Sequence, residues 1–175
     1  MSQTVEVRLA EDWERPSLAE LIVSVYRQFA TGDGDESFWE HHRQSTRQTV
    51  IHDESVVPIL ASCDGQTAGA VIVCPPYETR FGEKLVKNIY PEMRLLAVSP
   101  KFRNLGIAGK LVDRCEQIAI EQGFDTLSLH TTRLMAAAMA MYQRRGYERF
   151  CEIDFEAGPG LVVEGFKRRL QGLPA

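Results

Sequence analysis

Residues 103–123 constrain the fold more than any other part of the chain, because they join small residues to a long amphipathic run. The stretch is RNLGIAGKLVDRCEQIAIEQG, and it ends at Gly123, a good residue to follow the last turn of a helix. Its apolar residues recur at helical spacing, at Ile107, Leu111, Val112, Cys115, Ile118 and Ala119. Glycine is costly inside a helix, so Gly106 and Gly109 at the first turn need another explanation. The first turn carries unpartnered N–H groups and the positive end of the helix dipole, so small side chains there would let an anion approach the backbone.

Strands are predicted on both sides of this helix. EMRLLAV (92–98) precedes it and DTLSLH (125–130) follows it. Two strands joined by one helix should be parallel, with a right-handed crossover. Ligands of such sheets bind outside the carboxyl ends of the strands, which is where the helix begins. We therefore expect the backbone amides of about 104–109 to hold a phosphate or pyrophosphate.

The rest of the chain predicts further helices and strands and no domain boundary. A helix is expected from Asp12 onward, with Pro16 in its first turn, and a more polar one through 37–49. Strands, a loop and one more helix are expected at 4–9 (strand), 56–63 and 67–74 (a β-hairpin), 75–91 (loop), 134–145 (helix), 147–155 (strand) and 161–170 (strand). The prediction is one α+β domain spanning residues 1–175, with the strand–helix–strand unit 92–130 at its centre.

Composition excludes several classes of protein. The net charge of −4, from 20 Lys and Arg against 24 Asp and Glu, argues against nucleic-acid binding through the whole surface. No apolar run approaches membrane-spanning length, and the first residues lack the pattern of a signal peptide, so we expect a cytoplasmic protein without a membrane partner. The four cysteines lie far apart without CxxC pairs and indicate neither a zinc site nor a disulfide framework.

Two familiar nucleotide-binding signatures do not fit the glycines. A dinucleotide fingerprint needs G-x-G-x-x-G and an acidic residue at the end of the next strand. Here Gly106 and Gly109 are spaced differently, and Asp125 precedes its strand. A Walker A loop needs glycine five residues before its Gly-Lys pair and Ser or Thr after it. Asn104 stands at the first place, and the pair at 109–110 lacks the hydroxyl residue.

A third pattern, Arg/Gln-x-x-Gly-x-Gly/Ala, is matched by Arg103, Gly106 and Ala108. A strand ending in LAV precedes it, and AMAMYQRRGYERF, with the pattern Y-x-x-x-G-Y, follows the next strand. Together these stretches resemble the GNAT superfamily of N-acetyltransferases. The resemblance covers most of the chain, and its specific part is about 92–150.

The resemblance implies a fold and a co-substrate. The expected fold is a single-domain, mixed and mostly antiparallel sheet, with a central parallel strand pair splayed at the cofactor cleft and about four flanking helices. A bulge in the apolar run at 95–98 would open the pair. Acetyl-coenzyme A would place its pyrophosphate on the helix start and its pantetheine arm along the strand edge. The cofactor-binding residues implied are Leu96, Ala97, Val98, Arg103, Asn104, Leu105, Gly106, Ile107, Ala108 and Gly109.

Family membership also implies catalytic residues. In the stretch AMAMYQRRGY, Tyr142 matches the family's general acid. A phenol with a pKa of about 10 can protonate a departing thiolate. The general base is open among Glu92, His130 and a relay through water. Many relatives carry Asn seven residues before the tyrosine to contact the cofactor, where this chain has Met135. The hydroxyl of Thr131 or Thr132 would replace that contact.

The acceptor is a primary amine that the sequence does not identify. A small amine, an antibiotic, a polyamine and a protein N-terminus all stay open, and dimerisation, frequent in such folds, is not specified. Residues expected around the acceptor are Phe29, Phe38, Trp39, His41, His42, Tyr77 and Phe81. No metal is expected, because the adjacent histidines point to different faces of their helix.

Two other functions compete with acetyl transfer by direct attack in a ternary complex. One is a regulatory module that binds acyl-coenzyme A and has lost turnover, which the replacement of asparagine by Met135 would favour. The other is a nucleotide-dependent oxidoreductase, which would have to bind NAD(P). Release of free thiol with a panel of amines separates the first from a transferase, and thermal protection by NAD(P) tests the second.

Overall fold

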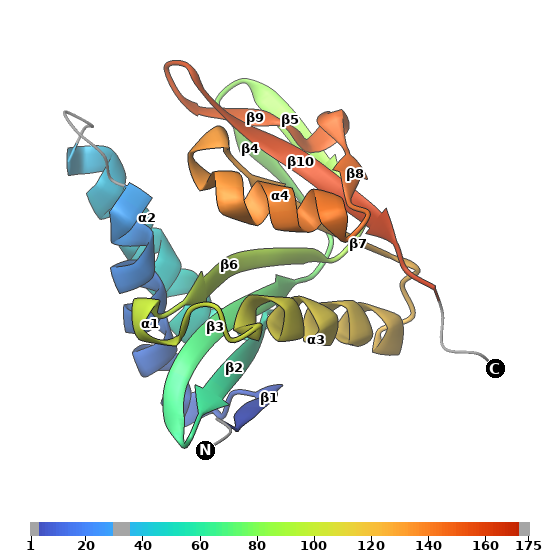
Figure 1. Cartoon of the computed structure of the whole chain (residues 1–175). Helices are drawn as coiled ribbons and strands as arrows, with labels where there is room; N and C mark the ends of the chain where they lie inside the picture. The colour runs from blue at the N-terminus through green and yellow to red at the C-terminus, as the bar shows by residue number, and fades with distance from the viewer. Residues whose placement is uncertain (1–3, 30–35, 172–175) are drawn as a thin grey trace. The chain divides into compact units, whose positions relative to one another are not determined.

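The computed structural model of the 175-residue chain describes residues 4–29 and 36–171 (Figure 1). The chain divides into two compact units, one of residues 1–73 and 95–115 and the other of residues 74–94 and 116–175. Strand β6 (Glu92–Val98) and helix α3 (Ile107–Glu121) each run from one unit into the other. The predicted single domain is not tested by this division and stays a prediction.

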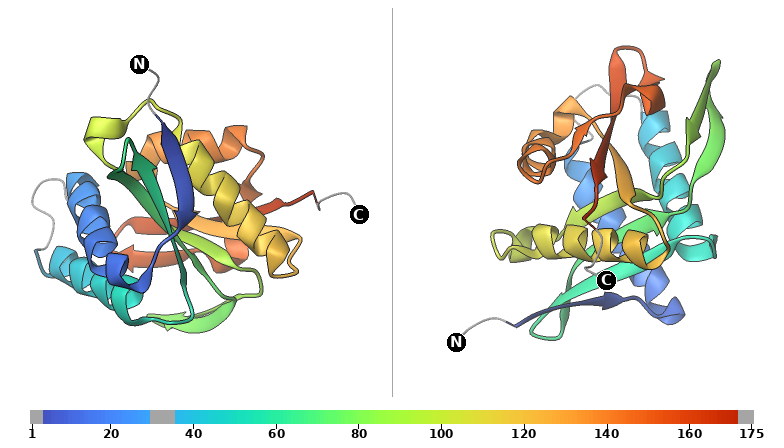
Figure 2. Two further views of the ribbon diagram at one scale, coloured as in Figure 1. Left: turned by 90° about the horizontal axis from the view of Figure 1, so that it is seen from below. Right: turned by 90° about the vertical axis from the view of Figure 1, so that its right-hand side faces the viewer.

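The first unit places two helices beside an antiparallel sheet. The strand order is β1-β2-β3-β6, and helices α1 and α2 lie side by side (Figure 2). The elements not yet given are β1 (Val5–Leu9), α1 (Arg15–Tyr26), α2 (Glu36–Arg47), a π-helical turn (Gln48–His52), β2 (Val57–Cys63) and β3 (Gln66–Cys74). Asp64 and Gly65, with φ of 49° and 79°, make the tight turn of the predicted hairpin, which is confirmed.

A glycine on β3 lets the sheet and α3 approach closely. A Cβ atom at Gly69 would lie 3.0 Å from the carbonyl oxygen of Ala97, 3.1 Å from Leu111 and 3.2 Å from Ile107. The side chains of Leu111 and Ile107 are both fully buried. The close contact fixes the start of α3 against β3 and the end of β6, within the first unit.

The second unit holds the parallel strand pair. Its strand order is β6-β7-β10-β8, with β9 also paired to β10, and all of these pairs except β6–β7 are antiparallel. The remaining elements are β4 (Tyr77–Phe81), β5 (Lys84–Asn88), β7 (Thr126–Thr131), α4 (Ala136–Arg144), β8 (Glu148–Arg149), β9 (Phe155–Gly158) and β10 (Leu161–Arg169). The mixed, mostly antiparallel sheet and the helices α1–α4 confirm the predicted α+β class.

The prediction of a loop at 75–91 is wrong. Strands β4 and β5 form an antiparallel hairpin there, with Tyr77 opposite Asn88 and Phe81 opposite Lys84. Gly82, with φ of 62°, occupies the first position of the two-residue turn, which requires a positive φ. The paired strands bury Val86 against Phe150 and Ile153, so tertiary packing fixes the hairpin.

The predicted strand at 147–155 is interrupted. Residues Cys151–Ile153 form a 3₁₀ turn, whose Ile153 packs on the bare backbone of Gly165. The amide of Phe150 donates to the carbonyl oxygen of Gly165 at 2.8 Å, and the amide of Gly165 donates to the Asp154 carboxylate at 2.7 Å. The turn needs a residue without a side chain opposite it. The interruption of the predicted strand therefore depends on Gly165, which lies more than ten positions further along the chain.

Strand β6 changes conformation in its middle. Glu92 pairs with Ser128 and Met93 with Leu129 in parallel register at the beginning of the strand. Leu95 then adopts φ of 59°, in the left-handed region that L-residues rarely occupy. The observed irregularity lies in the segment where broken alternation predicted a bulge.

Candidate active site

The start of α3 is shaped by two residues with left-handed backbone. Asn104 has φ of 64° and Gly106 has φ of 72°. The first backbone bond of the helix runs from the amide of Lys110 to the carbonyl of Gly106, at 3.2 Å. By the geometry of an α-helix, the amides of 107–109 precede the first possible acceptor within the helix. The predicted anion-binding residues therefore lie at a helix start with available donors.

Gly106 is open to its surroundings. A Cβ atom built there would meet no atom within 4 Å, and the residue is exposed. Close helix–sheet packing therefore does not explain Gly106, whereas it does explain Gly69 on β3. The positive φ requires glycine at 106, and the open space leaves room for a ligand.

The other predicted cofactor-binding residues lie in the same unit. Ala97 on β6 is buried, and Leu96 and Val98 are half-buried. Arg103 is exposed and donates from Nη2 to Oε1 of Gln28 at 3.0 Å. The arrangement fits a diphosphate at the helix start, with an exposed cation beside it.

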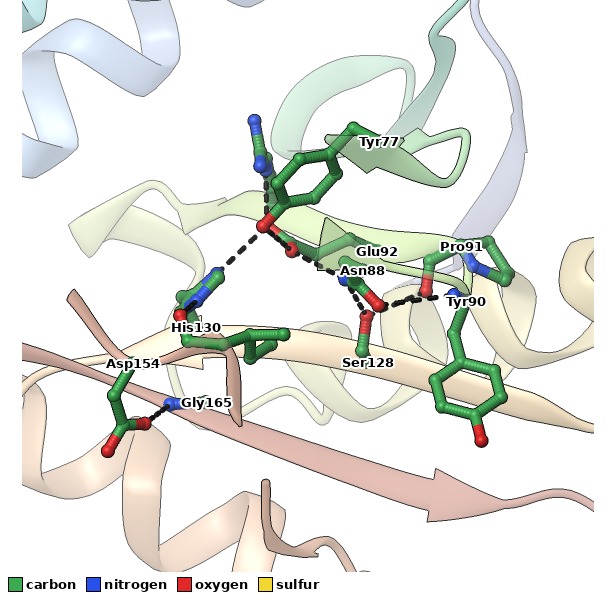
Figure 3. Close-up of polar contacts among 11 residues, drawn as sticks. Tyr77, Asn88, Tyr90, Pro91, Glu92, Ser128, His130, Asp154 and Gly165 are labelled. Atoms are coloured by element: carbon green, nitrogen blue, oxygen red, sulfur yellow. Dashed lines mark hydrogen bonds and ion pairs between the residues drawn. The ribbon is translucent and has the colours of Figure 1, made fainter. Parts of the chain in front are cut away.

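A buried carboxylate organises the second unit. We define the Glu92 cluster as the side chains that meet around Glu92, most of which Figure 3 shows: Tyr77, Asn88, Glu92, Arg94, Ser128 and His130. The side chain of Glu92 is fully buried. Tyr77 donates to its Oε2 at 2.8 Å and Asn88 at 3.0 Å, while Arg94 donates to Oε1 and His130 Nδ1 lies 3.1 Å from Oε1. Strands β4, β5, β6 and β7 each contribute to this cluster.

Electrostatics keep Glu92 ionised. Burial by itself would raise the pKa of its carboxyl group, but the hydrogen bond from His130 and the charge of Arg94 lower that pKa from 4.5 to about 2. Burial and the neighbouring carboxylate raise the pKa of Tyr77 well above its ordinary value. Tyr77 is therefore a hydrogen-bond donor in the cluster, and Glu92 is a weak base.

Both ring nitrogens of His130 face acceptors. Nδ1 faces Glu92, and Nε2 lies 2.7 Å from the carbonyl oxygen of Ile153. Each ring nitrogen of His130 is therefore engaged by a neighbour within the second unit. The structure thus brings together the two predicted base candidates, and both are engaged within the second unit.

Sequence reasoning missed several members of the cluster. Asn88 bridges Glu92 and Ser128, whose hydroxyl donates to the carbonyl oxygen of Pro91 at 2.9 Å. Arg94 lies two residues after Glu92 on the same strand, so its side chain emerges on the same face. The spacing of two residues between Glu92 and Arg94 in a predicted strand was the signal that could have identified Arg94. Recognising Asn88 required the β4–β5 hairpin, which was predicted as a loop.

The general-acid candidate lies on α4. Tyr142 is only 4% exposed, and its ring packs edge-on against Tyr147 with centroids 5.8 Å apart. Thr131, at the end of β7, is 2% exposed, and its Oγ1 finds no hydrogen-bond partner among the described residues. A buried hydroxyl without a partner is costly, so Thr131 is suited to a ligand that supplies one.

The predicted acceptor residues do not form one group. In the first unit His42 stacks between Trp39 and Tyr26, with centroids 5.2 and 5.4 Å away, whereas His41 is exposed. In the second unit Tyr77 joins the Glu92 cluster. The others are accounted for separately: Phe29 packs edge-on against Tyr26, Phe81 stacks on Phe155, and the side chain of Phe38 lies outside the described residues.

Comparisons with known proteins agree on a family. The model of the acetyltransferase (GNAT) family matches residues 16–147. The chain is 32% identical over 96 residues to N-acetyltransferase family 8 member 3 of Rattus norvegicus, a match that covers 55% of this chain and 40% of that protein. The chain spans 40 to 50% of the length of this relative and its Mus musculus counterpart.

Solved structures show the same fold at low sequence identity. A GNAT-family acetyltransferase from Staphylococcus aureus superposes with a TM-score of 0.69 at 18% identity, covering 96% of this chain and 100% of that one. The PaiA N-acetyltransferase of Thermoplasma acidophilum, solved in complex with coenzyme A, gives a TM-score of 0.69 at 14% identity, covering 95% and 99%. Among residues 4–29 and 36–171, no helix has both the length and the apolar character needed to cross a bilayer.

Proposed function

The chain belongs to the acetyltransferase (GNAT) family, and we propose that it transfers an acetyl group from acetyl-coenzyme A to a primary amine. The observation that carries the proposal is the open start of α3. There Gly106 combines a φ of 72° with empty space around its Cα, at a helix end rich in N–H donors. The likeness to the N-acetyltransferases of rat and mouse supports the same activity.

The residues present fit acetyl-coenzyme A. We assign its diphosphate to the amides of 104–109 with Arg103, and its pantetheine arm to the backbone of Leu96–Val98. Thr131 supplies a hydrogen bond in place of the asparagine that Met135 replaces, which its unpartnered buried hydroxyl supports. The thioester provides an activated acetyl group.

The proposed chemistry is direct attack. The acceptor nitrogen forms a bond to the acetyl carbon while the carbon–sulfur bond breaks, and the amine gives up one proton. Tyr142 donates a proton to the departing sulfur, so coenzyme A leaves as the free thiol. Among the three base candidates, Glu92, His130 and a water relay, we favour the relay. Glu92 has a pKa of about 2, and both nitrogens of His130 are engaged.

Positive charge near the acceptor would support this chemistry. An amine must lose its proton before it can attack, and a nearby cation lowers an amine's pKa. Arg94 is such a cation, because the neighbouring Glu92 raises its pKa against the effect of burial. A cytoplasmic location and a single domain remain predictions of the sequence, as does the acceptor's being a small amine or a protein N-terminus, and the sequence leaves dimerisation open.

A thiol-release assay tests the proposal. We expect acetyl-coenzyme A to raise the melting temperature, and at least one amine of a broad panel to release free coenzyme A. Tyr142→Phe should lower kcat by about 100-fold or more while leaving the binding of acetyl-coenzyme A intact. No stabilisation by acetyl-coenzyme A would overturn the assignment. Binding without turnover across the panel would favour the silent regulatory module.

A further inference from the structure

Arg94 is held in a fixed geometry by two neighbours. Its Nε donates to Oε1 of the buried Glu92, and its Cζ lies 4.6 Å from the centroid of the Tyr77 ring. Tyr77 is itself tied to Glu92 through its hydroxyl, at 2.8 Å. A guanidinium that is both stacked and ion-paired through Nε has lost most of its rotamer freedom before any ligand arrives.

The side chain of Arg94 is partly open to its surroundings. The side chain is 34% exposed, whereas that of Glu92 is 0% exposed. Because the hydrogen bond to Glu92 is made by Nε, we infer that the fork of Nη1 and Nη2 is the part that receives a ligand. Two parallel N–H donors of this kind match the two oxygens of a carboxylate.

The accessible charge of the cluster is positive. Glu92 accepts hydrogen bonds from Tyr77, Asn88, Arg94 and His130 and has no exposed surface, so it offers nothing to an approaching ammonium group. The ring nitrogens of His130 are taken up by Glu92 and the carbonyl of Ile153, so the exposed charge of the cluster is that of Arg94. An anion is therefore favoured near Arg94, and a polycation is disfavoured.

We propose that Arg94 binds a carboxylate of the acceptor, so that the substrates are amines that also carry a carboxylate group, such as free amino acids. This inference rests on the proposed acetyltransferase activity and narrows its acceptor. Arg94 is the specificity residue, Glu92 and Tyr77 position it, and polyamines and polycationic antibiotics are poor acceptors.

Matched acceptors test the proposal. The assay compares kcat/KM for the standard amino acids, their amides and the corresponding decarboxylated amines. We expect the acid to be preferred over its amide by about 10- to 100-fold for the best side chain, since a charge-assisted bidentate pair is lost with the amide. Arg94→Gln should bring the ratio of acid to amide close to one, mainly through the KM of the acid. Arg94→Lys should restore only part of it, because lysine lacks the fork.

A control on the same unit separates charge from recognition. Arg80 on β4 is exposed and contacts the carbonyl of Glu83, so Arg80→Gln removes one positive charge away from the cluster and should leave the ratio unchanged. Melting temperatures show whether Arg94→Gln still folds, and the ratio between two acceptors is independent of the active fraction. Equal or better acetylation of the amides by the unmodified protein overturns this inference and leaves the acetyltransferase standing. Absence of turnover with every amine overturns both.

Discussion

The start of α3 in the first unit and the Glu92 cluster in the second are built in opposite ways. The helix start uses backbone donors from one short stretch, set by the left-handed conformations of Asn104 and Gly106. The cluster uses side chains that four strands bring together around one carboxylate. Backbone sites tolerate most substitutions that preserve φ and open space, whereas a side-chain cluster depends on the charge and length of each member.

The two regions also treat negative charge differently. At the helix start the dipole and the available amides leave an unfilled place for an anion. In the cluster an anion is already present, because Glu92 is buried and ionised among its donors. The first region is thus arranged to receive a ligand's charge on backbone donors, and the second to hold its own carboxylate in place beside the partly exposed Arg94.

Gly106→Glu should have the largest effect on binding. The new side chain would fill the open space, place a like charge where the diphosphate binds and force a β-carbon into φ of 72°. We expect binding of acetyl-coenzyme A to be lost, a decrease of about 100-fold or more by isothermal titration calorimetry.

Gly65→Glu is the matched control for backbone strain. Gly65 lies in the β2–β3 turn of the same unit, with φ of 79° and nothing within 4 Å of a built Cβ. It should lose a similar amount of stability while keeping its affinity for acetyl-coenzyme A. Undiminished affinity in Gly106→Glu would show that the helix start is not the anion site.

Glu92→Gln should have an intermediate effect, on stability and its pH dependence. The folded pKa of about 2 lies below the ordinary 4.5, so the ionised carboxylate stabilises the fold above pH about 4.5 and this contribution is lost as pH falls toward 2. The shift corresponds to about 3 kcal/mol. We expect Glu92→Gln to unfold more easily at pH 7 and to show a flatter stability profile between those pH values in urea titrations.

Glu14→Gln provides the comparison in the first unit. A hydrogen bond from Arg8 lowers the pKa of Glu14 to about 2 as well. This substitution should also flatten the acid profile, yet leave acetyl transfer unchanged, because Glu14 contacts Arg8 and the backbone of Glu11 instead of the Glu92 cluster. If the stability of Glu92→Gln changed with pH between 4.5 and 2 in the same way as that of the unmodified protein, the buried carboxylate would not carry its charge in the folded protein.

Local features of the sequence predicted the start of α3 well, together with other turns and helix ends. The hairpin turn at Asp64 and Gly65, the helix beginning near Gly106 and its end at Gly123 each depend on conformations that the residue itself favours. The structure has positive φ at each of these positions. The conflict between glycine and helix propensity at 106 was itself the signal for a functional site.

The second region was predicted only in part, because its members are distant in sequence. Glu92 and His130 were identified through a family resemblance, but Asn88 joins Ser128 across 40 positions and Tyr77 joins Glu92 across 15. Such pairs follow from strand order and register, which single-sequence periodicity does not give. Because 75–91 was treated as a loop, Tyr77 was expected only as an acceptor residue and not beside Glu92, and Asn88 was not identified at all.

Thr131→Val should have the smallest effect, and it tests whether a side chain of the second unit helps to bind acetyl-coenzyme A. Valine has nearly the shape of threonine, so the change removes a buried hydroxyl that has no partner among the described residues. Losing it should stabilise the free protein by about 1 kcal/mol, because an unsatisfied buried group is removed. The same change should weaken acetyl-coenzyme A binding by about fivefold, since the hydrogen bond that Thr131 makes to the ligand is lost.

The opposite signs make this prediction informative. Thr126 lies on the same strand and is also buried, but its Oγ1 donates to Asp125 at 2.9 Å. Thr126→Val should therefore destabilise the free protein and leave the affinity unchanged, so it differs from Thr131→Val in both measurements. If Thr131→Val left the affinity intact, the site for acetyl-coenzyme A would draw on the backbone of the first unit without this hydroxyl. Acetyl-coenzyme A would then be bound mainly by backbone donors, as the comparison between the start of α3 and the Glu92 cluster suggests.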